Sequence, residues 1–337
     1  MINMVTSHAD IHVDNPMHKS DKKLDQAARA AWMYYVAGQT QHEIADALGV
    51  SRQVAQRLVA CAIDNGLISV NIAHPVGRCM ALADQLQKQY GLHQCQVVPS
   101  LGMDSAGILR AVAVAGAEVM AQFLRQEQPL VIGVGSGRSL KAAIDELPDF
   151  ERPQHSCVSL IGAIAADGSC TRYDVPLWMA EKTQGRYFIL PAPLFADSAA
   201  DRDLWCNHRI YRTVTEKAAQ ADVTFIGIGS MGYHCPLHKD GFISELDVDA
   251  LLGSNVMAEM LGNFIDINGQ RVSYELDKRL TSASLRIQPE KPVIAIAGGK
   301  EKHQAIKAVL SGHWVNGLVT DEESAMALLA QEPAARA

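Results

Sequence analysis

The patterned part of the chain opens with helical stretches separated by short breaks. Apolar residues recur at helical spacing over residues 25–37, and Gly38 then interrupts the run. Thr40 precedes a second run as a candidate N-cap, with Glu43 three residues further on, which is typical of a capping box. Gly49 ends that run after two helical turns. The hydrophobic pattern therefore predicts a longer helix followed closely by a short one.

A third helix is predicted after a turn of only three or four residues. Ser51 can cap it, and residues 52–65 contain neither glycine nor proline before Gly66. Two helices joined by so short a turn, with Ala45 where they must approach closely, form the helix-turn-helix pattern. Residues 67–72 then alternate as a strand that would form a wing or a hinge. The alternative is a generic helical hairpin inside a larger bundle.

Beyond residue 75 the pattern changes to strands alternating with helices. Strands are predicted over residues 94–98, 129–133, 223–228, 292–296 and 317–319, and helices over residues 106–124, 140–147 and 302–310. This alternation predicts an α/β fold with a Rossmann-like parallel sheet, and several strands end in glycine at the edge where such sheets bind ligands. We expect a flexible tail over residues 1–20, a winged-helix-like helix-turn-helix domain over 21–73 and an effector-binding domain over 74–337.

Length, composition and charge narrow the classes that fit this pattern. The 337 residues exceed what one hydrophobic core usually organises, and a hydrophobic share of 48% is that of a globular protein. A formal charge of −7 argues against binding nucleic acid through bulk electrostatics. The seven cysteines form no CxxC pair, which fits reduced thiols. Arg110 and Glu118 interrupt the most apolar stretch, so we expect a cytoplasmic protein that does not bind membranes.

The start of the third predicted helix carries side chains suited to reading base edges. The residues expected to contact DNA are Gln41, Ser51, Arg52, Gln53, Gln56 and Arg57. Arginine can donate two hydrogen bonds to guanine and glutamine can pair with adenine, whereas serine more often holds phosphate. Residues 26–72 nevertheless carry three arginines against three acidic residues. A neutral reading head binds weakly alone, so we predict a homo-oligomer that places several heads on one double-stranded DNA.

Two sets of residues give the chain a specific family resemblance. In the head they are Ala31, Trp32, Met33, Tyr34, Tyr35, Gln41, Glu43, Ile44, Ala45, Leu48, Gly49, Val50, Ser51, Arg52, Arg57, Leu58 and Gly66. In the large domain they are Gly133, Val134, Gly137, Arg138, Ser139, Leu140, Leu190, Pro191, Ala192, Pro193, Gly227, Ile228, Gly229, Ala297, Gly298, Gly299, Lys302, Ala305, Ile306, Thr320, Asp321 and Glu322. On these residues the chain resembles the SorC family of sugar-binding transcriptional regulators.

The resemblance implies an effector domain similar to the sugar-phosphate isomerase and deaminase fold. It also implies a homotetramer on operator DNA and control by a sugar, a polyol or a sugar phosphate. The chain departs from the family pattern at Gln53, Ala55, Gln56 and Ser136. The operator and the effector of other members therefore do not transfer to this chain.

The glycine-rich strand ends supply a candidate effector site. Residues 135–139 lie between a strand and a helix, so their backbone N–H groups would face an anion or a hydroxyl-rich ligand. Lys302 follows another strand end at the same edge, while Asp174 and Glu259 stand at polar positions of the resembled family. The expected effector-binding residues are Gly135, Ser136, Gly137, Arg138, Ser139, Asp174, Gly229, Glu259, Gly298 and Lys302. A ligand-free turn and a solvated lysine would give the same local pattern.

An enzyme of sugar-phosphate metabolism with a helical N-terminal extension is the rival interpretation. It would need an acid and a base over one substrate, but the strand ends offer glycines and serines without a clear catalytic pair. Arg138 stands where a dinucleotide-binding loop needs its third glycine, which disfavours a nicotinamide-dependent reductase. The histidines and cysteine of residues 233–238 are separated by Pro236 and have no second cluster to complete a zinc site. We therefore expect no catalytic residues, no metal and no cofactor.

Overall fold

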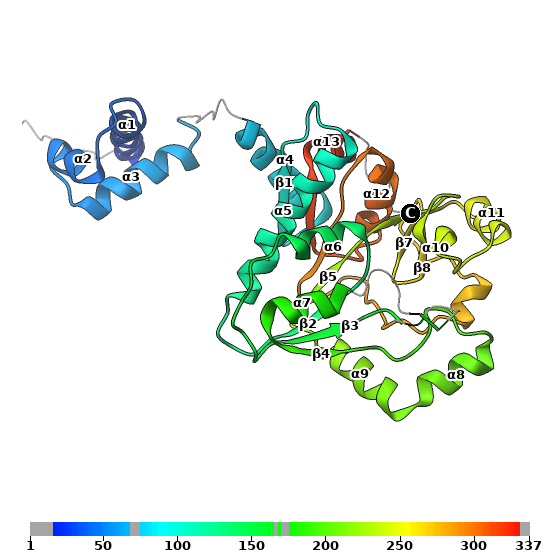
Figure 1. Ribbon diagram of the computed structural model, residues 1–337. Helices are drawn as coiled ribbons and strands as arrows, with labels where there is room; N and C mark the ends of the chain where they lie inside the picture. The colour runs from blue at the N-terminus through cyan, green and yellow to red at the C-terminus, as the bar shows by residue number, and fades with distance from the viewer. Residues whose placement is uncertain (1–15, 68–74, 163, 165–167, 170–174, 331–337) are drawn as a thin grey trace, which may run out of the picture. The chain divides into compact units, whose positions relative to one another are not determined.

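The computed structural model describes residues 16–67, 75–162, 164, 168–169 and 175–330. The chain separates into two compact units, residues 1–73 and residues 74–337 (Figure 1). The first unit contains only helices in its described part, and the second is built around a large sheet. Each unit has its own hydrophobic core.

The first unit consists of α1 (Pro16–Tyr35), α2 (Gln41–Leu48) and α3 (Arg52–Asp64). Its core consists mainly of small side chains, which let the three helices approach closely: Ala27, Ala30, Ala31, Ile44, Ala45, Ala55, Leu58, Val59 and Ala62. Thr40 and Glu43 form a capping box at the start of α2, and Gly49 ends that helix with φ +66°. The turn between α2 and α3 is therefore set by local sequence. The expected strand at residues 67–72 falls almost entirely outside the described residues.

Helix α1 begins earlier than the hydrophobic pattern predicts. The periodicity starts at Asp25, but the helix starts at Pro16, inside the segment expected to be a tail. Proline is favoured in the first turn of a helix because its fixed φ matches the helical value. Hydrophobic periodicity is present only where a helix packs against a core. The first turns of α1 are polar, so the hydrophobic pattern does not predict them.

The second unit contains a seven-stranded sheet in the order β1-β10-β9-β5-β2-β3-β4, with every neighbouring pair parallel. The strands are β1 (Gln94–Val98), β2 (Val131–Val134), β3 (Ser156–Ser159), β4 (Arg186–Phe188), β5 (Val223–Ile226), β9 (Val293–Ile296) and β10 (Gly317–Asp321). Successive side chains of a strand face opposite sides, so both faces must be covered. Ile294 and Ile296 join one core cluster, and Ala295 between them joins the other.

Helices cover both faces of this sheet. The cluster that contains Ile294 is completed by side chains of α5 (Ser105–Leu124), α6 (Arg138–Asp145) and α7 (Val175–Thr183). The opposite cluster includes side chains of α4 (Pro75–Tyr90), α9 (Arg209–Ala219), α12 (His303–Ser311) and α13 (Glu322–Leu329). The Rossmann-like α/β architecture expected from the alternation is confirmed.

A second, smaller sheet lies in the stretch between β5 and β9. It is antiparallel and consists of β6 (Gly229–Ser230), β7 (Val256–Met260) and β8 (Asn263–Asp266), accompanied by α10 (Pro236–Lys239) and α11 (Glu245–Gly253). The 3-10 turns η1 (Glu275–Lys278) and η2 (Lys300–Lys302) follow it along the chain. The hydrophobic pattern does not predict this sheet, because its strands are short and irregular.

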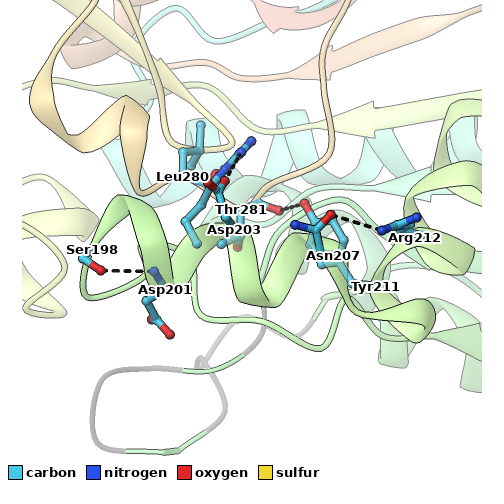
Figure 2. A network of polar contacts seen from close by, with 9 residues as sticks. Ser198, Asp201, Asp203, Asn207, Tyr211, Arg212, Leu280 and Thr281 are labelled. Carbon is cyan, nitrogen blue, oxygen red and sulfur yellow. Dashed lines mark hydrogen bonds and ion pairs between the residues drawn. The ribbon is translucent and has the colours of Figure 1, made fainter.

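Hydrogen bonds tie α9 and its neighbour α8 (Ala199–Asn207) to the segment after η1 (Figure 2). The Tyr211 hydroxyl donates to the Thr281 carbonyl at 2.6 Å, and Arg202 donates to the Leu280 carbonyl at 3.2 Å. Burial raises the pKa of the Tyr211 hydroxyl, so it remains a donor throughout the neutral range. These bonds hold Leu280 and Thr281, at the start of the irregular stretch that leads to β9, against α8 and α9.

Helix α5 is the most apolar helix among the described residues. By length and composition it could cross a membrane, but 56% of its apolar window is buried in the second unit. Ala115, Val119 and Met120 are buried in the core cluster that contains Ile294. The helix is therefore a core helix of an α/β domain.

His155, fully buried between α5 and β2, makes the stability of the second unit depend on pH. Its Nδ1 accepts the Leu130 N–H and its Nε2 lies 3.2 Å from the Leu124 carbonyl, which can only accept, so the ring is neutral. Burial lowers the pKa of His155. The unfolded chain therefore takes up a proton near the ordinary histidine pKa of about 6.5 while the folded chain does not.

We expect the free energy of unfolding to be highest above that value and to fall as the pH drops from about 7 to 5.5. His155→Gln should lower the stability at pH 7 by about 1–3 kcal/mol and flatten this slope. Denaturant titrations at several pH values measure both effects. The exposed His93 gives the control His93→Gln. An unchanged slope in the His155 variant would contradict this assignment.

Candidate functional site

The first candidate site is the outer face of α3. Ser51, Arg52, Gln53, Gln56 and Arg57 are all exposed, while Gln41 at the start of α2 is half-buried. The four side chains from Arg52 to Arg57 recur at helical spacing and share one face. Ala55 and Leu58 turn the opposite way into the core.

The start of α3 is held by its cap. The Ser51 side chain accepts the Val54 N–H at 3.3 Å, which fixes the first turn of the helix. At the neighbouring cap, hydrogen bonds from the Thr40 backbone and hydroxyl lower the pKa of Glu43. The exposed polar face of α3 is thereby presented on a rigid helix that a short, glycine-terminated turn joins to α2.

The second candidate site is a pocket at the carboxyl edge of the large sheet. Along the chain, strands are added outward from β2 to β4, and β5 then returns to the other side of β2. The loops after β2 and β5 therefore diverge, and such a switch point is where open α/β sheets bind ligands. Residues of both loops line the pocket, together with residues of the small sheet and of η2.

The two loops approach each other closely. A methyl group added at Gly227 would lie 2.8 Å from the backbone carbonyl oxygen of Ser136, so only glycine fits there. The Gly135 N–H donates to the Phe225 carbonyl at 2.9 Å and prolongs the pairing of β2 with β5. The pocket floor is therefore fixed by backbone contacts.

Four charged residues line the pocket: Arg138, Asp240, Glu259 and Lys302. The Lys302 Nζ donates to the Ser139 hydroxyl at 3.3 Å, and the Gly262 N–H donates to Glu259 at 2.6 Å. Arg138 opens α6 beside the buried Ser139 and is itself exposed. Cations and free backbone donors at a helix N-terminus favour an anionic group, whereas a carboxylate accepts hydroxyl protons.

Burial shifts the ionisation of these groups. It raises the pKa of Glu259, against the opposing effects of the Gly262 N–H and of Lys302. It also lowers the pKa of Lys302, and the like charge of Arg138 adds to this effect. Each shift favours the neutral form, so a ligand that supplies a hydrogen-bond donor to Glu259 and a negative charge near Lys302 would stabilise both charged forms.

The remaining wall of the pocket is largely apolar, and the cavity volume is about 100 Å³. Its apolar lining residues are Ile161, Leu194, Ile228, Pro236, Leu237, Phe242 and Leu261. Most of them come from the segment between β5 and β9 or from the end of β3. A small ligand with both a polar and a carbon-rich side fits this lining.

Most of the residues expected in the effector site line this pocket. They are Ser136, Gly137, Arg138, Ser139, Gly229, Glu259 and Lys302. Gly135 and Gly298 are not among the lining residues, because Gly135 pairs with β5 and Gly298 packs against Asp321. Asp174 lies outside the described residues.

Sequence reasoning missed Ser230, Asp240, Phe242 and Leu261, which also line the pocket. Asp240, Phe242 and Leu261 do not follow a strand of the predicted parallel sheet. They reach the pocket only because the small antiparallel sheet folds against the switch point. Asp240, Phe242 and Leu261 have no local sequence signal for this role, whereas Ser230 follows the glycine-rich end of a predicted strand.

The segment 233–238 places a histidine against its own backbone. His238 Nδ1 lies 2.6 Å from the Tyr233 carbonyl oxygen. Among the described residues no group of three or more histidine, cysteine or acidic side chains could hold a metal ion.

Residues 74–330 match the protein family described as "Putative sugar-binding domain". The chain is 34% identical over 305 residues to the erythritol catabolism regulatory protein EryD of Brucella abortus, an alignment that covers 90% of this chain and 96% of the relative. It is 30% identical over 307 residues to the transcriptional regulator LsrR of Enterobacter sp. strain 638, with 90% and 92% covered. These relatives are transcriptional regulators.

Solved structures agree on the fold. The full-length sorbitol operon regulator SorC of Klebsiella pneumoniae superposes with a TM-score of 0.68 at 24% identity, over 91% of this chain and 99% of that chain. A helix-turn-helix head, an α/β domain and a pocket at its switch point define a ligand-responsive transcriptional regulator. The chain belongs to the SorC family of sugar-binding transcriptional regulators.

Gly227→Ala tests the close approach of the two pocket loops. The added methyl group must push the Ser136 carbonyl away, and overpacking of this kind costs about 1–3 kcal/mol of folding stability. Thermal unfolding of the purified chain measures the loss. Gly253→Ala is the matched control, because a methyl group there meets nothing within 4 Å. Equal melting temperatures for the two variants would refute the packing argument.

Proposed function

We propose that this regulator controls an operon for the breakdown of a polyol or a related sugar, and that a polyol or its phosphate binds the switch-point pocket as the effector. The observation that carries the proposal is the pairing of Lys302 with Ser139 in the same pocket as the half-buried Glu259. The arrangement offers donors for an anionic or hydroxyl oxygen at one end and an acceptor for hydroxyl protons at the other.

The size of the pocket and the nature of its relatives support the same ligand class. A cavity of about 100 Å³ suits a compact ligand with a short carbon chain. The relative EryD is named for erythritol catabolism, and SorC for the sorbitol operon. We therefore take erythritol and erythritol phosphate as the first probes of this chain.

On the DNA side, we propose that α3 enters the major groove of the operator. Arg52, Gln53, Gln56 and Arg57 would read base edges, and Ser51 and Gln41 would hold the phosphate backbone. The head has no net charge, so operator affinity would come from several heads in one homo-oligomer, which we propose to be a tetramer. A regulator of this kind acts in the cytoplasm.

Arg57→Ala should weaken operator binding without affecting the effector pocket. Loss of a base-reading arginine costs about 1–3 kcal/mol, roughly 5- to 150-fold in affinity. Fluorescence anisotropy with a duplex selected by the wild-type chain from a random pool measures the change. Arg29, an exposed arginine on α1 paired with Asp25, provides the control Arg29→Ala. If both variants bind that duplex as tightly as the wild type, α3 is not the reading helix.

Lys302→Gln should remove most of the stabilisation that the effector gives. We expect erythritol or erythritol phosphate to raise the melting temperature of the wild type, and the shift to collapse in this variant. Lys300→Gln, on the exposed side of the same turn, should keep the full shift. Thermal-shift titrations of both variants with sugars, polyols and their phosphates measure this. An equal shift in both variants would place the effector elsewhere.

A further inference from the structure

A buried carboxylate lies directly behind the effector pocket. Asp321, at the end of β10, has a fully buried side chain. Its Oδ2 accepts the Gly299 N–H at 2.8 Å and the Ser324 hydroxyl at 2.5 Å. Its Oδ1 accepts the Ser100 hydroxyl at 3.1 Å and the Ser324 N–H at 3.0 Å. Burial opposes ionisation, but these hydrogen bonds outweigh it and lower the pKa of Asp321.

The turn that Asp321 holds is the turn that delivers Lys302 to the pocket. Gly299 precedes η2, and the Lys302 N–H donates to the Gly299 carbonyl at 2.9 Å. A methyl group added at Gly298 would lie 2.6 Å from the Asp321 Oδ2. The turn and the carboxylate are therefore packed without spare room, so a displacement of one must displace the other.

The next residue connects this carboxylate to the first helix of the second unit. The side chain of Glu322 is only 2% exposed, and its Oε1 lies 3.2 Å from the Arg78 Nε on α4. Arg78 also contacts the Met326 sulfur on α13 at 2.7 Å. In the sequence, α4 directly follows the segment that joins the reading head to the effector domain. The Arg78 side chain is 53% exposed, but its removal would leave the buried Glu322 carboxylate without a compensating charge.

We propose that Asp321 and the Arg78–Glu322 ion pair couple the effector pocket to helix α4, so that a ligand at Lys302 alters the helix from which the chain leads back to the DNA-reading head. The proposal rests on the proposed function for its ligand. Asp321 acts as a positioning residue for the Gly299 turn, and the ion pair transmits the position of β10 and α13 to α4. Ligand binding can change operator affinity through this link only as far as it prefers one position of the turn.

The link can be perturbed without any ligand. Gly298→Ala forces the Asp321 carboxylate to move, so we expect faster hydrogen exchange for amides of residues 79–86 in α4. In a Glu322→Gln background the same glycine substitution should have little further effect, because the pair is already broken. Gly253→Ala is the control. Unchanged exchange in α4 of the Gly298 variant would overturn the proposal, whatever the effector proves to be.

The functional test compares operator affinity with and without erythritol phosphate. Arg78→Gln and Glu322→Gln should keep the dissociation constant for erythritol phosphate within about threefold, yet reduce the ligand-dependent change in operator affinity at least about fivefold. The double variant should lose no more than either single variant, because both break one pair. Asp321→Asn should weaken erythritol phosphate binding as well, since it releases the Lys302 turn.

Arg110→Gln serves as the matched control, because Arg110 and Glu146 form an exposed ion pair between α5 and α6 at 4.0 Å. It should preserve both the ligand affinity and the ligand-dependent change. Coupling retained in the Arg78 and Glu322 variants as fully as in this control would refute the proposal. If the wild type binds its selected duplex equally with and without erythritol phosphate, that compound is not the effector. The hydrogen-exchange experiment on Gly298→Ala would still test whether Asp321 and the Arg78–Glu322 pair connect the pocket to α4.

Discussion

The pairing of β2 with β5 is the constraint on which the effector domain depends. It reverses the order in which strands are added to the sheet, so the loops that follow these two strands leave in opposite directions. The backbone of the loops then continues the pairing for one further residue, where the Gly135 N–H meets the Phe225 carbonyl. A crevice between the two loops follows from this topology, provided that glycine occupies position 227.

Buried polar groups fix elements at both edges of the large sheet. Asp321 holds the turn before Lys302, and neutral His155 bridges the end of α5 and the start of β2. Each satisfies backbone or hydroxyl groups that would otherwise be buried without partners. Asp321 acts beside the pocket, whereas His155 acts at the opposite, amino edge of the sheet, where β2 and β3 begin. In the pocket, burial shifts the pKa values of Glu259 and Lys302 in the directions that favour their neutral forms. A ligand with complementary groups would favour the charged forms again.

The first unit is stabilised differently from the second. Its core consists mostly of alanine, its helices are short, and its caps rather than a large apolar core define its turns. With balanced charges it has little general electrostatic attraction for DNA, so in the proposed function binding would depend on the particular side chains of α3 and on the number of heads that act together.

The amino-acid sequence by itself determined the elements whose signals are local. The capping box at Thr40, the glycine turn at Gly49 and the strand of residues 94–98 all agree with the structure, since caps, turns and period-two alternation act over a few residues. The loop of residues 135–139 could also be placed, because a glycine-rich strand end is itself a local pattern. The tertiary structure alone decided that Phe242 and Leu261 close the pocket and that Asp321 supports its lysine. Those neighbours lie on separate elements of the chain, and only the order of strands in the sheet brings them together.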